Sequence, residues 1–85
     1  MRNVNEIENR IAFLVVEISL GRLTLSEILP QHTILGDLEL DSLDFATVML
    51  GCEEWLQCKV DEGGVNWRDI TTVHELAVLL ERSQR

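Results

Sequence analysis

The sequence predicts a small, all-helical domain that covers residues 1–85. Apolar residues recur at helical spacing in three segments, and no segment shows the sustained two-residue alternation, rich in β-branched residues, that indicates a half-buried strand. With 46% hydrophobic and 26% charged residues, the composition is that of a folded protein. We therefore expect a bundle of three longer helices and one short helix around a modest core.

The first helix is expected to begin after Asn3, because Asn3 and Glu6 have the spacing of a capping box. Gly21 is expected to end this helix. Residues at helical spacing form its apolar face, namely Ile7, Ile11, Leu14, Val15 and Ile18.

A long connection then reaches to Asp41, with turn-forming residues at Gly21, Pro30 and Gly36. Loops of this length are uncommon in small domains unless they are pinned to the core or functional. Apolar residues along the connection are expected to anchor it, namely Leu25, Ile28, Ile34, Leu35 and Leu38.

The second helix is expected to begin at Asp41-Ser42 and to end near Cys58. Asp41 can cap the helix, and Asp44 places a carboxylate in the first turn, where the helix dipole favours it. One apolar stripe should dock this helix on the core and consists of Phe45, Met49, Cys52 and Leu56.

A second apolar line on the same helix exceeds what packing requires, and it consists of Leu43, Ala46 and Leu50. Acidic residues lie beside it, namely Asp44, Glu53 and Glu54. Two interpretations are open. The line is either buried in a wide groove or exposed as an apolar strip within an acidic frame, which is typical of a docking surface.

The rest of the chain is expected to contain a turn at Gly63-Gly64, a short helical turn over residues 66–70 and a last helix. Thr72 and Glu75 have capping-box spacing at the start of that helix. Its apolar face consists of Val73, Leu76, Ala77 and Leu80.

Fifteen acidic against seven basic residues give a net charge of −8, which argues against nucleic acid or anionic lipid as the main partner and favours basic protein surfaces. No apolar stretch approaches the roughly 20 residues that cross a bilayer. The first residues do not resemble an export signal, so we expect a cytoplasmic protein. Cys52 and Cys58 are expected to remain reduced thiols.

Four carboxylates surround Ser42 in the segment from Gly36 to Asp44. A calcium loop does not fit this segment. If Asp37 is the first ligand, the sixth position is Ser42 instead of glycine, and the twelfth is Val48 instead of glutamate.

Hydrolase chemistry at Ser42 is also disfavoured, because an activated serine needs a base and a group that orients the base. His32 and His74 are interpreted as surface residues, and the neighbouring carboxylates would oppose an oxyanion. Ser42 has instead a favourable position, because an attached phosphodiester would lie near the positive end of the helix dipole. The alternative is that Ser42 only helps Asp41 to cap the helix.

Segment 37–44 reads Asp-Leu-Glu-Leu-Asp-Ser-Leu-Asp and resembles the modification motif of acyl carrier proteins. The likeness extends from Gly36 almost to the end of the chain, through Glu53-Glu54, Leu56, Val60, Ile70-Thr71-Thr72-Val73 and Leu76. It implies a four-helix bundle in which a separate phosphopantetheinyl transferase attaches 4′-phosphopantetheine from coenzyme A to Ser42. Acyl or aminoacyl groups would then travel as thioesters on that arm, so the protein would be a carrier and not an enzyme.

The resemblance also implies a monomer that is visited by acyl-loading and acyl-processing enzymes with basic docking surfaces. Their contacts would be Asp41, Leu43, Asp44, Ala46, Leu50, Glu53 and Glu54. Fatty-acid, polyketide, peptide and specialised pathways all stay open, and an unmodified acidic helical interaction module is the alternative from another class.

The sequence departs from the pattern of the carriers at three places. Glu39 replaces a common glycine, Thr47 replaces a common acidic residue, and the turn over residues 61–67 is longer. Gly51 is expected to admit a closely packed neighbour or the carried chain, and Trp67 to pack against the domain.

Overall fold

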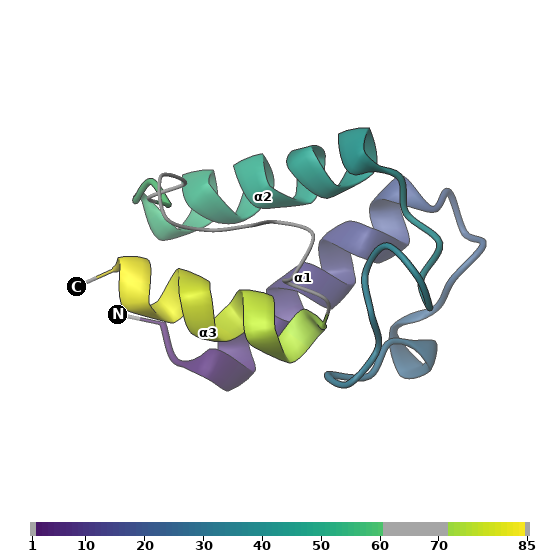
Figure 1. Cartoon of the computed structure of the whole chain (residues 1–85), viewed down its shortest axis with the longest axis horizontal. Coiled ribbons are helices and arrows are strands. Elements are labelled where there is room, and N and C mark those ends of the chain that lie inside the picture. Colours follow the sequence, from purple (N-terminus) through teal and green to yellow (C-terminus); the bar gives the residue numbers. More distant parts are fainter. Residues whose placement is uncertain (1, 61–71, 85) are drawn as a thin grey trace.

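The computed structural model describes residues 2–60 and 72–84, which are all-helical and contain no strand. Their elements are α1 (Val4–Ile18), the 3₁₀ helix η1 (Leu25–Glu27), α2 (Ser42–Leu56) and α3 (Val73–Ser83). Helices α2 and α3 run in the same direction, opposite to α1 (Figure 1). The all-helical prediction is confirmed, whereas the short helix predicted at 66–70 and the packing role of Trp67 lie outside the described residues.

Helix α1 begins as the sequence predicts. The Glu6 N–H donates to Asn3 Oδ1 at 2.9 Å, and the Asn3 N–H donates to Glu6 Oε1 at 3.5 Å, which completes the capping box. The helix ends at Ile18, earlier than predicted. Leu20 and Gly21 then adopt left-handed φ angles of 54° and 88°, so Gly21 serves the chain reversal after the helix.

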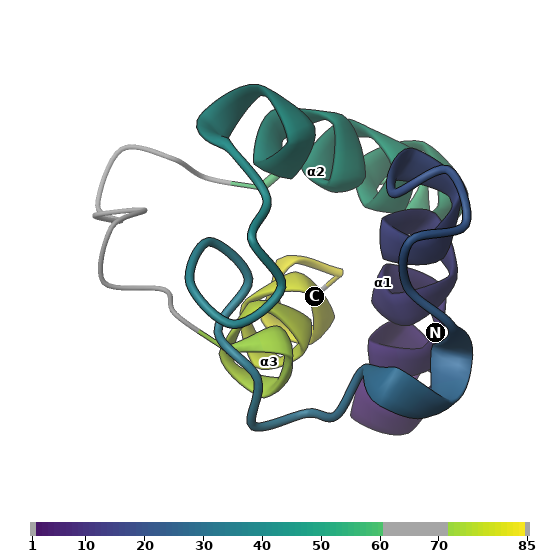
Figure 2. The same ribbon diagram turned by 90° about the vertical axis from the view of Figure 1, so that its right-hand side faces the viewer.

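The core forms where α1 packs against both α2 and α3, which lie on two sides of it (Figure 2). Three residues of α1, Ile7, Ile11 and Val15, are fully buried there. The stripes predicted on α2 and α3 face the same core, and Val48 joins them although the predicted stripe omitted it. The buried core residues of the other elements are Ile28, Ile34, Leu38, Leu40, Phe45, Val48, Met49, Cys52, Val60, Val73, Leu76, Ala77 and Leu80.

The long connection is pinned to the core by a partly different set of residues from the one predicted. Ile28, Ile34 and Leu38 are buried as predicted, but the anchoring roles predicted for Leu25 and Leu35 are wrong, because these side chains are 55% and 41% exposed. A further anchor, Leu40, is 4% exposed; the spacing of apolar residues did not single it out. Which apolar residues of the connection are buried therefore depends on how the loop folds back onto the core.

Hydrogen bonds between Thr33 and Asp37 hold the conformation of this long connection. The Asp37 N–H donates to Thr33 Oγ1 at 2.7 Å, and the Thr33 N–H donates to Asp37 Oδ2 at 3.0 Å. The loop also reaches α3, because the carbonyls of Pro30 and His32 accept from the amides of His74 and Val73. The loop thereby satisfies two of the amides that a helix N-terminus leaves without intrahelical partners.

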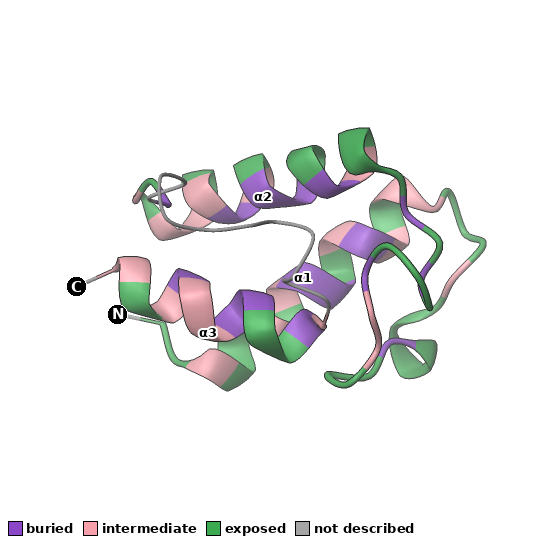
Figure 3. Cartoon of the chain, in the orientation of Figure 1, coloured by how far each residue is buried: buried purple, intermediate pink, exposed green. Residues whose placement is uncertain are grey.

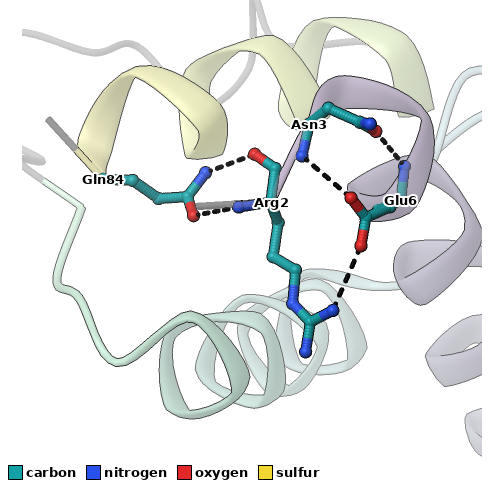
Figure 4. Close-up of polar contacts among 4 residues, drawn as sticks. All are labelled: Arg2, Asn3, Glu6 and Gln84. Carbon is teal, nitrogen blue, oxygen red and sulfur yellow. Dashed lines mark hydrogen bonds and ion pairs between the residues drawn. The ribbon is translucent and has the colours of Figure 1, made fainter.

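The two ends of the described chain are held together by the side-chain amide of Gln84 (Figure 4). Gln84 Oε1 accepts from the backbone N–H of Arg2 at 2.8 Å, and Gln84 Nε2 donates to the backbone carbonyl of Arg2 at 2.8 Å. Arg2 also pairs with Glu6 at 3.1 Å, and its guanidinium lies 4.6 Å from the ring centroid of Trp55. Side chains from α1 and α2 therefore join this contact.

Gln84→Ala is expected to lower the free energy of unfolding by roughly 1 kcal/mol, because it removes two exposed hydrogen bonds to Arg2. Urea unfolding followed by circular dichroism measures the change. Gln31→Ala is the control, since Gln31 is an exposed loop residue. Equal stabilities of the two variants would show that the amide of Gln84 does not hold the chain ends.

Candidate functional site at the N-terminus of α2

The start of α2 has the local structure that the sequence predicts. Asp41 has an extended backbone, and its Oδ1 accepts from the Asp44 N–H at 2.8 Å. The Asp41 carbonyl accepts from the Phe45 N–H at 2.9 Å, which closes the first helical turn. Ser42 is therefore the first residue of the helix, directly after its cap.

Ser42 is exposed, and within residues 2–60 and 72–84 its hydroxyl group makes no hydrogen bond. Asp41 caps the helix with its own side chain, so the interpretation of Ser42 as a second capping group has no support. Leu40 and Phe45 are buried on either side of the serine, at 4% and 7% exposure. The backbone is thus pinned to the core while the Ser42 hydroxyl is open to solvent beside the positive helix end.

The second apolar line of α2 is exposed. Leu43 and Leu50 are 74% and 60% exposed, and Ala46 is exposed between them. Figure 3 shows the exposed outer face of the helix above a buried inner face. Of the two interpretations left open by the sequence, the structure supports the exposed strip over the buried groove. We call Leu43, Ala46 and Leu50 the exposed strip.

The acidic residues near the exposed strip differ in their surroundings. Glu54 is exposed and Asp44 is half-buried. Glu53, predicted as a docking residue, accepts from the Val60 N–H at 2.9 Å through Oε2. Its carboxylate therefore holds the chain that leaves α2, a structural role that helical spacing alone did not reveal.

The exposed strip continues into a shallow hollow of about 530 Å³ at the C-terminal end of α2. Leu50 of the exposed strip, the acidic Glu54 and the basic Lys59 all line this hollow. The lining residues are Leu50, Glu53, Glu54, Gln57, Cys58 and Lys59.

Gly51 lies where α1 and α2 come close. A Cβ atom at this position would lie 3.0 Å from Leu14 Cδ1, closer than ordinary packing permits. The glycine thus admits a side chain of α1, which confirms the predicted close packing of a neighbour.

Both cysteines are free thiols, as predicted. Burial raises the pKa of the Cys52 thiol from 9.0 to about 12. Burial also raises the pKa of Cys58, which is only half-buried. Only the thiolate form of cysteine is reactive, and the raised pKa keeps Cys52 protonated near neutral pH. Cys52 therefore serves as a packing residue of the core.

An alkylating reagent at about pH 8 is expected to modify Cys58 and to leave Cys52 intact in the native protein, whereas both react in urea. Peptide mapping by mass spectrometry measures the alkylation. Equal labelling of both thiols in the native protein would contradict the burial of Cys52.

The raised pKa of Cys52 also predicts that the stability of the protein falls above about pH 9. The thiol of the unfolded chain then ionises, whereas the native thiol stays protonated up to about pH 12.

The two histidines have local partners. His74 Nδ1 lies 2.8 Å from Glu8 Oε2 and joins α3 to α1. His32 Nδ1 accepts from the Leu29 N–H at 3.1 Å. Among the described residues the hydrogen-bond partners of the two imidazoles are Leu29 and Glu8, and neither imidazole contacts Ser42. His74 is exposed as expected, whereas His32 is half-buried in its turn.

Residues 2–60 and 72–84 include no helix with the length and apolar character needed to cross a membrane. In the same residues no three His, Cys, Asp or Glu side chains gather in a way that could hold a metal ion. Comparison with profiles of protein families finds no matching family, and comparison with curated proteins finds no match.

Proposed function

We propose that this protein carries 4′-phosphopantetheine on Ser42 and presents acyl intermediates, bound as thioesters, to enzymes of fatty-acid, polyketide or related specialised biosynthesis. The observation that carries the proposal is the exposed Ser42 hydroxyl, free of hydrogen bonds in the described part of the chain, at a capped helix start. Its motif resembles that of acyl carrier proteins.

The chemistry requires a second protein. Ser42 Oγ attacks the β-phosphorus of coenzyme A, the bond to the adenosine 3′,5′-bisphosphate group breaks, and the serine proton passes to a base of the transferase. The product is an anionic phosphodiester, which the N-terminal dipole of α2 favours. The thiol of the arm would then carry the acyl group, so this chain supplies the attachment point and no catalytic group.

The exposed strip supports a docking role for α2. Leu43 and Leu50 offer apolar contacts, while Asp44 and Glu54 can attract basic side chains of a partner. Contacts of this kind are fast and sensitive to salt, which suits a carrier that visits several enzymes. The proposal includes a monomeric, cytoplasmic four-helix bundle, and the short helix expected over residues 66–70 lies outside the described residues.

Intact-mass spectrometry tests the proposal after incubation with a broad-range phosphopantetheinyl transferase, Mg²⁺ and coenzyme A. The protein is expected to gain one phosphopantetheinyl unit, and Ser42→Ala to gain none. Ser26→Ala is the matched control, because Ser26 is also exposed but lies in η1. An unchanged mass of the unaltered protein, in a reaction that modifies another carrier, would overturn the proposal.

An unmodified acidic interaction module is the second candidate, because the exposed strip could dock a partner without a prosthetic group. It predicts that Ser42→Ala keeps partner binding and cellular function intact. A peptidyl carrier is a further alternative and would be modified on Ser42 in the same way as an acyl carrier. The mass of the thioester isolated from cells would distinguish these two kinds of carrier.

A further inference from the structure

The segment that leads to Ser42 contains a residue in an unfavourable backbone conformation. Glu39 has a φ of 56°, in the left-handed region where glycine is favoured and a side chain is strained. The Glu39 N–H donates to the Gly36 carbonyl at 3.2 Å, and the Leu40 N–H donates to the Ile34 carbonyl at 3.3 Å. A tight loop thus imposes this conformation immediately before the cap of α2.

Arg22 contacts this strained residue from the other end of the long connection. Arg22 Nη2 donates to the Leu38 carbonyl at 3.2 Å, and Arg22 Nη1 lies 3.5 Å from Glu39 Oε2. The guanidinium therefore holds the backbone before Glu39 and the side chain of Glu39 at once. The turn after α1 brings Arg22 to this place, with the Arg22 N–H donating to the Ser19 carbonyl at 3.1 Å.

We propose that Arg22 and Glu39 are positioning residues for the modification of Ser42. Together they form a latch, defined by the two contacts of Arg22, that holds the loop in its strained conformation. Only Leu40 and the capping residue Asp41 separate Glu39 from Ser42, so the latch fixes the segment that presents the hydroxyl. The pair is exposed to solvent and its effect is modest. Its consequence for modification rests on the proposed function.

The latch itself is tested without any transferase, by amide hydrogen exchange of the unmodified protein. Arg22→Ala is expected to speed exchange of the Leu40 amide by roughly fivefold, because the loop opens more often. Glycine adopts a positive φ without strain, so in an E39G background the same change is expected to have less than half this effect. The core amide of Ile11 reports on global unfolding and should keep its rate in the Arg22→Ala variant.

Two results would overturn the latch. The first is an unchanged Leu40 exchange rate in Arg22→Ala. The second is an equal acceleration in the native and E39G backgrounds, since Arg22 would then act independently of the strained residue.

The consequence for modification is read from transferase kinetics. Arg22→Ala is expected to raise KM for the carrier roughly 1.5-fold with kcat unchanged, because fewer molecules present Ser42 correctly while the serine itself is unaltered. The double variant with Glu39→Gly should recover a KM close to that of the unaltered protein. Unchanged KM in Arg22→Ala would overturn the positioning role, whereas failure of the unaltered protein to be modified would overturn only the proposed function.

Discussion

Replacing Leu43 and Leu50 together by alanine is expected to lower kcat/KM of a phosphopantetheinyl transferase for this protein by roughly 10- to 100-fold. These leucines are 74% and 60% exposed on the helix that Ser42 begins. Truncation of each apolar contact is expected to cost about 0.7–1.4 kcal/mol in the interface, and the two losses together correspond to the expected 10- to 100-fold reduction. Steady-state kinetics with varied carrier concentration measures the change.

The fold should not contribute to this effect, because neither side chain is part of the buried core. Leu25→Ala provides the matched control, since Leu25 is 55% exposed but lies in η1, away from the start of α2 in sequence. Urea unfolding should give the same free energy for the double variant and the control. Kinetics equal to those of the control would show that the exposed strip is not the transferase contact.

Ile11→Ala is expected to lower the free energy of unfolding by about 2–5 kcal/mol. Ile11 is fully buried on α1, the helix that packs against both others. Alanine is a better helix former than isoleucine, so the entire loss reflects packing and the cavity left behind. A domain of this size has only about 5–15 kcal/mol in total, so the variant should be partly unfolded at modest urea concentrations.

Thermal and urea unfolding followed by circular dichroism measure this effect. Leu43→Ala is the matched control, because it also truncates an aliphatic side chain in a helix, but an exposed one. A loss below about 1 kcal/mol for Ile11→Ala would show that the core relaxes around the cavity.

The parts of this structure that depend on local rules were predictable. Asn3 and Asp41 cap their helices with side chains that reach three residues ahead, and such contacts follow from spacing alone. The exposed strip was recognisable for the same reason, because helical periodicity separates it from the buried stripe. Periodicity could not decide whether the strip was covered, since that depends on where the other helices lie.

The loop was harder to predict because its order comes from contacts between distant residues. Leu40 is buried and Leu35 is not, in a loop whose turn is held by hydrogen bonds between Thr33 and Asp37. The contact of Arg22 with Leu38 spans 16 residues and leaves no periodic signal. The left-handed backbone of Glu39 likewise leaves no signal in the spacing of apolar residues.

The contact between Gln84 and Arg2 determines how the domain can be handled in experiments. The contact brings Arg2 and Gln84 together at one end of the molecule, and the first turn of α2 lies toward the opposite end (Figure 1). An affinity tag, a fluorophore or a surface tether attached to either end would leave Ser42 unobstructed. A short glycine linker that joins the two ends should likewise leave the start of α2 accessible.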